Sequence, residues 1–129
     1  MDLCEAAAPY LDEYEGPYCI ESFNPLVLRW YRKNRPEVLR GQLSTDFVKS
    51  GETGDKKLYF LLKHLLMNFL SRPDFIAYNH LYRRTFSFII IKILFKTPAF
   101  GWTIDSKRLL EETRGDFQTF IFEGFAPED

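Results

Sequence analysis

The sequence predicts an α/β protein with a parallel sheet, and two observations carry that prediction. Short apolar segments alternate with helix-like segments along all 129 residues, which gives five strands and five helices. Residues 17–44 pass through a strand, a tight turn, a helix and a second strand within so few residues that the two strands must run parallel. The alternation alone leaves two architectures open, an open doubly wound sheet and part of a (β/α)8 barrel.

The unit at residues 17–44 is defined by local signals. Residues 18–23 are short, apolar and aromatic, as in a buried strand. Asn24 can cap the next helix, and Pro25 stands in the first turn, where its missing N–H costs nothing. Residues 26–35 carry apolar side chains at helical spacing, and Pro36 ends the helix before a second strand at 38–43.

The other elements follow from the same kinds of signal. A first helix is predicted at residues 2–14, with an apolar face made of Leu3, Ala6, Ala7, Tyr10 and Leu11. Further helices are predicted at 58–70, at 81–95 and from Asp105 or Ser106 to Thr113, and further strands at 75–78, 100–104 and 119–122. In the helix at 81–95 the apolar face is expected to hold Phe86, Ile89, Ile90 and Ile93.

Residues 44–57 form a polar, glycine-containing stretch that is predicted to be the longest loop. Because this loop follows a strand of a parallel sheet, it is expected on the face where ligands bind, although an ordinary solvated connection has the same composition.

Composition and charge exclude several classes of protein. Seventeen basic and eighteen acidic residues give a net charge of −1, so nothing indicates binding to nucleic acid or to an anionic membrane. The apolar stretch at 86–95 contains Lys92 and is about half the roughly 20 residues that span a bilayer, so no transmembrane span is expected. Cys4 and Cys19 have no metal or redox spacing, which favours buried thiols in a reducing cytoplasm.

Four short motifs occur in order along the chain. They are Ile20-Glu21-Ser22-Phe23-Asn24-Pro25, Arg40-Gly41-Gln42-Leu43, Gly101-Trp102-Thr103-Ile104 and Phe120-Ile121-Phe122-Glu123-Gly124-Phe125. Together they resemble the C-terminal part of glycerophosphodiester phosphodiesterases, and the resemblance covers residues 1–129. It implies the last five parallel strands of a (β/α)8 barrel, with intervening helices. It also implies the family's reaction, in which a divalent cation, calcium or magnesium, assists hydrolysis of a glycerophosphodiester to glycerol 3-phosphate and an alcohol.

The resemblance implies roles for three residues of this chain. Phe23 resembles the aromatic residue that walls the glycerol pocket, and Trp102 matches the tryptophan of the penultimate strand. Glu21 alternates with Ser22 along its strand, so it points the same way as Phe23 and could polarise a water or approach the metal. Each residue also has a purely structural alternative. The two aromatic residues can be ordinary barrel core, and Glu21 can be a carboxylate that is hydrogen-bonded locally or exposed.

The motifs that carry the family's chemistry do not occur in this sequence. These are a His-Arg-Gly strand, a His-Asp loop, a Glu-x-Asp pair and a Glu-x-Lys strand, all of which we expect upstream of Met1. Hydrolysis of a phosphodiester needs a cation, a base and an acid, so no catalytic residue and no metal ligand is assigned here. His64 and His80 do not match the family's positions, and Asn24 with the ending Glu123-Gly124-Phe125 departs from the acidic residues that the family more often shows.

Three functional hypotheses follow. The first is an incomplete phosphodiesterase, inactive until the missing strands are supplied. The second is a non-catalytic half-barrel that binds or assembles; as a half-barrel folded alone it is expected to form a homo-oligomer, because its first and last strands leave unpaired backbone groups. The third, a doubly wound domain that binds a phosphate compound, lacks the glycine-rich loop that such domains use.

Overall fold

The computed structural model describes residues 2–45, 68–85, 88–89, 92–93 and 96–127. Five strands form one sheet in the order β1-β2-β3-β4-β5, and every neighbouring pair is parallel. Their bounds are β1 Cys19–Ser22, β2 Leu39–Ser44, β3 Phe75–Asn79, β4 Ala99–Ile104 and β5 Thr119–Phe122. All five predicted strands are thus confirmed, with ends that move by one residue at most.

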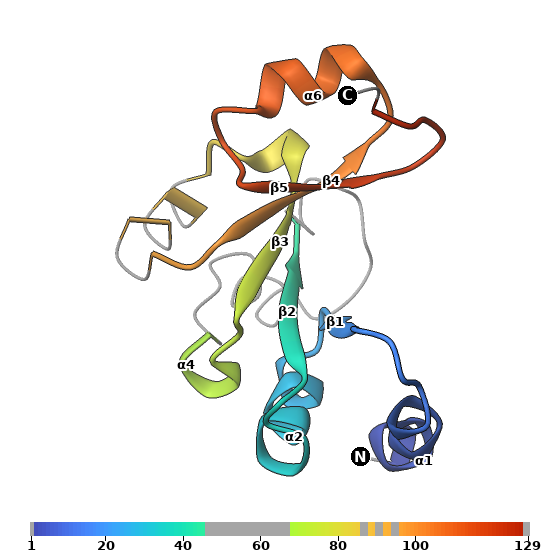
Figure 1. Cartoon of the computed structure of the whole chain (residues 1–129). Helices are drawn as coiled ribbons and strands as arrows, with labels where there is room; N and C mark the ends of the chain where they lie inside the picture. Colours follow the sequence, from blue (N-terminus) through green and yellow to red (C-terminus); the bar gives the residue numbers. More distant parts are fainter. Residues whose placement is uncertain (1, 46–67, 86–87, 90–91, 94–95, 128–129) are drawn as a thin grey trace.

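The strand order decides between the two architectures that the sequence left open. A doubly wound sheet reverses its strand order at a switch point, whereas here each strand pairs only with its neighbours in sequence. The sheet also turns strongly along its width, so that in Figure 1 β5 crosses the view at a steep angle to β2. The protein is therefore a partial barrel: five parallel strands of a curled half-barrel with intervening helices.

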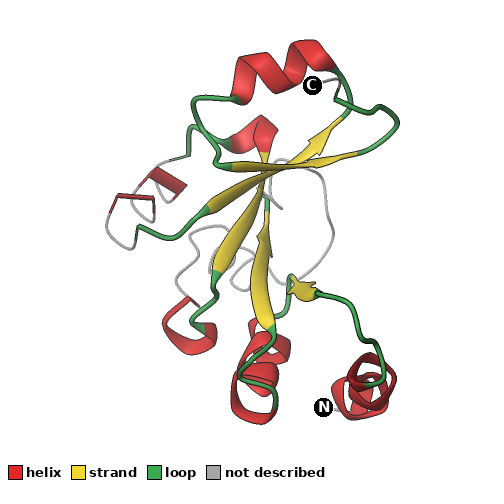
Figure 2. Ribbon diagram, viewed as in Figure 1, coloured by secondary structure: helices red, strands yellow, loops and turns green. Residues whose placement is uncertain are grey.

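The helices lie around the strands, as Figure 2 shows. Their bounds are α1 Asp2–Asp12, α2 Pro25–Asn34, α4 Asn68–Ser71, the 3-10 helix η1 His80–Tyr82, and α6 Lys107–Thr113. The predicted caps are present: the Asn24 side chain accepts a hydrogen bond from the Leu26 N–H at 3.0 Å. Of the two candidates for capping α6, Ser106 does so, by accepting from the Leu109 N–H.

Two hydrophobic clusters fix the helices to the outer face of the sheet. Near β1 and β2, the buried side chains of Cys4, Tyr31 and Val38 join α1 and α2 to the sheet. Near β3 and β4, the cluster consists of Ile76, Tyr78, Phe88, Ala99 and Phe117. Because side chains alternate along a strand, the residues between these positions point to the inner, concave face.

Two predicted helix faces were wrong. In α1 the buried residues are Cys4 and Ala8, whereas Leu3 and Tyr10 are each 79% exposed. Apolar residues lie on both sides of this helix, and the smaller ones pack closely against α2, which leaves the larger side chains outside. The predicted helix at 81–95 begins instead as η1. Of the face predicted for it, Ile89 and Ile93 are exposed and Phe86 and Ile90 lie outside the described residues, while Phe88 is buried in their place.

Some predictions fall outside the described residues. The predicted loop at 44–57 lies outside the described residues from residue 46 on. The predicted helix at 58–70, which contains His64, is described only from Asn68, where α4 begins. In the part of the chain that the structure describes, no helix is long and apolar enough to cross a bilayer.

Candidate functional site

The candidate site lies on the concave face and extends from the start of β3 to the carboxyl ends of the strands. Glu21, Gly41 and Phe75 are register partners across β1, β2 and β3, so their side chains share one face. A Cβ atom on Gly41 would lie 3.0 Å from Glu21 Cγ and 2.3 Å from Phe75 Cε2. The glycine therefore leaves the space that the glutamate and the phenylalanine ring both use.

Glu21 is an exposed residue whose carboxyl group is nevertheless partly enclosed. Burial raises the pKa of Glu21 above its ordinary value. Next to it, the ring of Phe75 stacks on that of Phe100, with 4.2 Å between the ring centroids. Among the described residues, the Glu21 carboxylate has no hydrogen-bond or ion-pair partner.

Phe23 and Trp102 are in direct contact. Their ring centroids are 5.9 Å apart at an interplanar angle of 75°, an edge-to-face arrangement. Phe23 follows β1 and Trp102 lies in β4, with β2 and β3 between them in the sheet. Such a contact requires the sheet to curl until both rings meet across its concave side. The structure thus brings together the two aromatic residues assigned to one pocket, while their contact with substrate stays a prediction.

Gln42 holds the turn that carries Phe23. Its side chain is 1% exposed, and its Nε2 donates to the carbonyl oxygens of Ser22, Phe23 and Leu43 at 3.0–3.1 Å. On the other side of Phe23, the Asn24 N–H donates to Ser22 Oγ at 3.0 Å. Sequence reasoning named Gln42 only as part of a motif; a polar side chain inside a buried strand was the signal that could have found it.

His80 was given no role from the sequence, because it does not match the family's positions. It is the residue directly after β3, and its Nδ1 lies 3.2 Å from the backbone oxygen of Trp102. The imidazole therefore lies against the backbone of the strand that carries Trp102, at the carboxyl end of β3. Its position directly after a strand was the available signal, because residues at the carboxyl ends of parallel strands form the ligand-binding edge.

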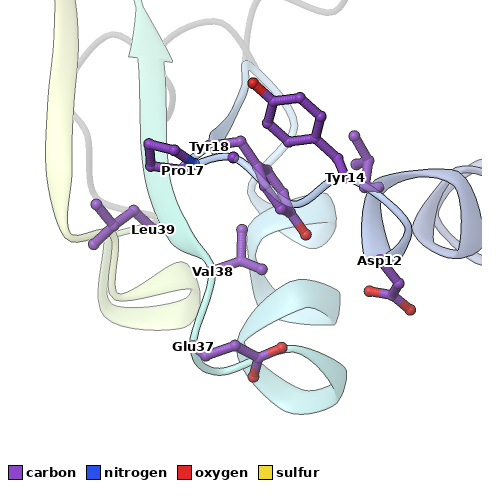
Figure 3. A pocket seen from close by; sticks show the side chains of 9 residues that line it. Asp12, Tyr14, Pro17, Tyr18, Glu37, Val38 and Leu39 are labelled. Carbon is purple, nitrogen blue, oxygen red and sulfur yellow. The ribbon is translucent and has the colours of Figure 1, made fainter.

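A hollow lies at the opposite, amino-terminal end of the strands. It measures about 440 Å³ and lies between the end of α1 and the start of β2. Figure 3 shows Tyr14 and Tyr18 on one side of it and Glu37 and Leu39 on the other. Ligands of parallel α/β sheets bind at the carboxyl ends of the strands, so we assign the candidate site to the edge with Phe23 and Trp102.

Within the described ranges, no three His, Cys, Asp or Glu side chains gather closely enough to hold a metal ion. The divalent cation that the resemblance implies therefore has no ligand set among these residues, and no chemical step below is drawn through it.

Comparison of the chain with models of known protein families, and with curated proteins, found no match. The curled parallel sheet and the residues at its carboxyl edge are therefore the features from which a function can be inferred.

Proposed function

We propose that the chain is the C-terminal part of a glycerophosphodiester phosphodiesterase barrel and supplies one wall of the substrate pocket. The observation that carries the proposal is the contact between Phe23, directly after β1, and Trp102, in β4, because β1 and β4 are not neighbours in the sheet. An edge-to-face aromatic pair offers a rigid apolar surface for the C–H groups of a glycerol unit. Glu21, one alternation below Phe23 on the same face, offers a carboxylate to a water or to a polar group of the substrate.

On this proposal the acid, the base and the ligands of the calcium or magnesium ion belong to further strand–helix units of a complete barrel. The 129-residue chain alone is then expected to show no measurable diesterase activity, because a pocket wall positions a substrate but transfers no proton. Cys4 is buried, as expected, whereas Cys19 is exposed, so the expectation of a buried thiol was wrong for Cys19. Both are free thiols, which supports the proposal of a reducing, cytoplasmic location.

Complementation tests this function directly. The chain would be mixed with a separate polypeptide that carries the first three strand–helix units of a glycerophosphodiester phosphodiesterase. Release of glycerol 3-phosphate from glycerophosphocholine would be measured with calcium or magnesium. We expect turnover in the mixture only, and its loss in a Phe23→Ala, Trp102→Ala variant that still folds. Turnover by the isolated chain above a heat-treated control, or none in a mixture shown to associate, would contradict the proposal.

A second candidate, a non-catalytic half-barrel that assembles with itself, is favoured by a different observation. The outer side of α1 presents Leu3 and Tyr10 to solvent, each 79% exposed. β1 pairs with β2 on one side, and no described strand pairs with its other side. A second copy could cover both surfaces, so this function predicts a stable homo-oligomer. Sedimentation showing a monomer at about 100 times the concentration used in the activity assay would exclude this second function.

A further inference from the structure

The imidazole of His80 is oriented by a hydrogen bond to the backbone of β4. Its Nδ1 is 3.2 Å from the carbonyl oxygen of Trp102. A carbonyl oxygen can only accept a hydrogen bond, so Nδ1 must carry the proton and donate it. In the neutral imidazole the other nitrogen, Nε2, is then an acceptor with a free lone pair.

Nothing in the described part of the chain uses that lone pair. His80 is half-buried, and no hydrogen bond to its Nε2 occurs among the described residues. Because Nε2 has no partner among these residues and is not a fully buried atom, it is accessible to solvent. The ring nitrogens lie on different sides of the imidazole, and Nε2 therefore points away from the Trp102 carbonyl.

The backbone around His80 is held in place by several contacts. The Asn79 side chain accepts from the Leu81 N–H at 3.0 Å, which fixes the start of η1. Arg83 Nη1 donates to the His80 carbonyl oxygen at 3.0 Å, and Arg83 Nε donates to Asp116 at 2.9 Å. An imidazole on a fixed backbone, with its tautomer set by a second fixed group, is preorganised for one hydrogen bond.

We propose that His80 is a specificity-determining residue that accepts, at Nε2, a hydrogen bond from a hydroxyl group of a polyol phosphate held beside Phe23 and Trp102. The inference rests on the proposed function and adds to it a residue that recognises the hydroxyl groups of the glycerol unit. Contacts between aromatic rings and C–H groups do not distinguish glycerol from propane, because both molecules present C–H groups. A hydrogen-bond acceptor beside the rings does distinguish them, because only glycerol has hydroxyl groups. His80 is thus a selective contact and takes no part in cleaving the ester.

Two phosphate esters of the same size separate this role from general binding. Glycerol 3-phosphate and n-propyl phosphate differ only in the two hydroxyl groups. Their dissociation constants would be measured with the 129-residue chain from chemical-shift changes in its ¹H–¹⁵N spectrum. We expect the wild type to prefer glycerol 3-phosphate by about 2- to 10-fold, as one hydrogen bond provides. His80→Leu should bind both esters equally, and the matched surface variant Leu81→Ala should keep the preference.

A measurement on the unmodified protein keeps the inference testable if His80→Leu does not fold. Long-range ¹H–¹⁵N correlation of the imidazole should show the neutral ring protonated at Nδ1, and glycerol 3-phosphate should shift the Nε2 resonance. Protonation at Nε2, equal binding of the two esters by the wild type, or a preference that survives in folded His80→Leu would each overturn the role of His80 and leave the proposed function standing. If neither ester binds, the pocket itself and the role of His80 both fail.

Discussion

Replacing Gly41 by alanine tests the central geometric claim about the site. The new Cβ would lie 2.3 and 2.4 Å from two ring atoms of Phe75 and 3.0 Å from Glu21 Cγ. Carbon atoms in contact are roughly 3.5–4.0 Å apart, so the ring would have to move by about 1 Å or more. It has little room to do so, because Phe75 is 5% exposed and stacks on Phe100. Overpacking of this kind costs about 1–3 kcal/mol of the free energy of unfolding.

The chain offers a matched control. A Cβ on Gly115 would meet no atom within 4 Å, and the backbone there has no positive φ. Gly115→Ala should therefore be neutral, or stabilising by about 0.4–1 kcal/mol through the unfolded state. Equilibrium unfolding in urea, followed by circular dichroism, measures both variants with the same slope analysis. Gly41→Ala should be the less stable by at least about 1 kcal/mol.

The obstacle itself can be identified with a double-mutant cycle. In a Phe75→Leu background the aromatic ring is gone, so adding Gly41→Ala should cost less than it does in the wild type. Stabilities of Gly41→Ala and Gly115→Ala that agree within about 0.5 kcal/mol, or a cost unchanged by Phe75→Leu, would refute the reasoning. The first result would mean that the floor of the site has space for a methyl group, and the second would mean that the cost does not come from the ring of Phe75.

Three further outcomes follow from the contacts described. Gln42→Leu removes the donor shared by three backbone carbonyls and should lower the free energy of unfolding by about 1–3 kcal/mol, with faster hydrogen exchange in the turn after β1. Glu21→Gln should raise Tm at pH 7: a carboxyl whose folded-state pKa is raised favours the native state at low pH and loses that contribution as pH rises through the folded pKa. The gain in Tm should shrink toward pH 3, and the exposed control Glu13→Gln should show no gain. Equal Tm values for Glu21→Gln and the wild type at pH 7 would contradict this prediction. Asp74→Ala leaves Arg40, which is 7% exposed, without its 2.8 Å ion pair and should cost about 2–3 kcal/mol in urea unfolding; a loss below about 0.5 kcal/mol would show that Arg40 finds another partner.

The sheet could be predicted from the sequence because its signals are local. Asn24 and Pro25 mark the start of α2 whatever the rest of the chain does, and the short connection forces the strands on either side of that helix to be parallel. The curl of the sheet is not local, and its consequence for the site came from the resemblance alone. The resemblance assigned Phe23 and Trp102 to one pocket; the structure shows that the two rings are in contact, and their part in a pocket stays a prediction.

Other features could not be read from the chain because packing decides them. In α1 both faces are apolar, so periodicity does not say which face meets α2, and the larger residue Tyr10 ends outside. The role of Gln42 depends on carbonyl groups about 20 residues away in sequence. The tautomer of His80 depends on the carbonyl of Trp102 in another strand. The position of a histidine or glutamine in the sequence does not show which group its side chain will hydrogen-bond.

The strictly sequential order of the strands has a consequence for how the protein is made. Each strand pairs only with the one synthesised just before it and the one just after it, so no strand has to wait for a distant segment of the chain. On the ribosome, β1, α2 and β2 can therefore assemble while β5 is still being translated, and later units add to an existing edge. Growth by addition of similar units at one edge is also the way in which a gene can lengthen or shorten such a protein by whole strand–helix steps.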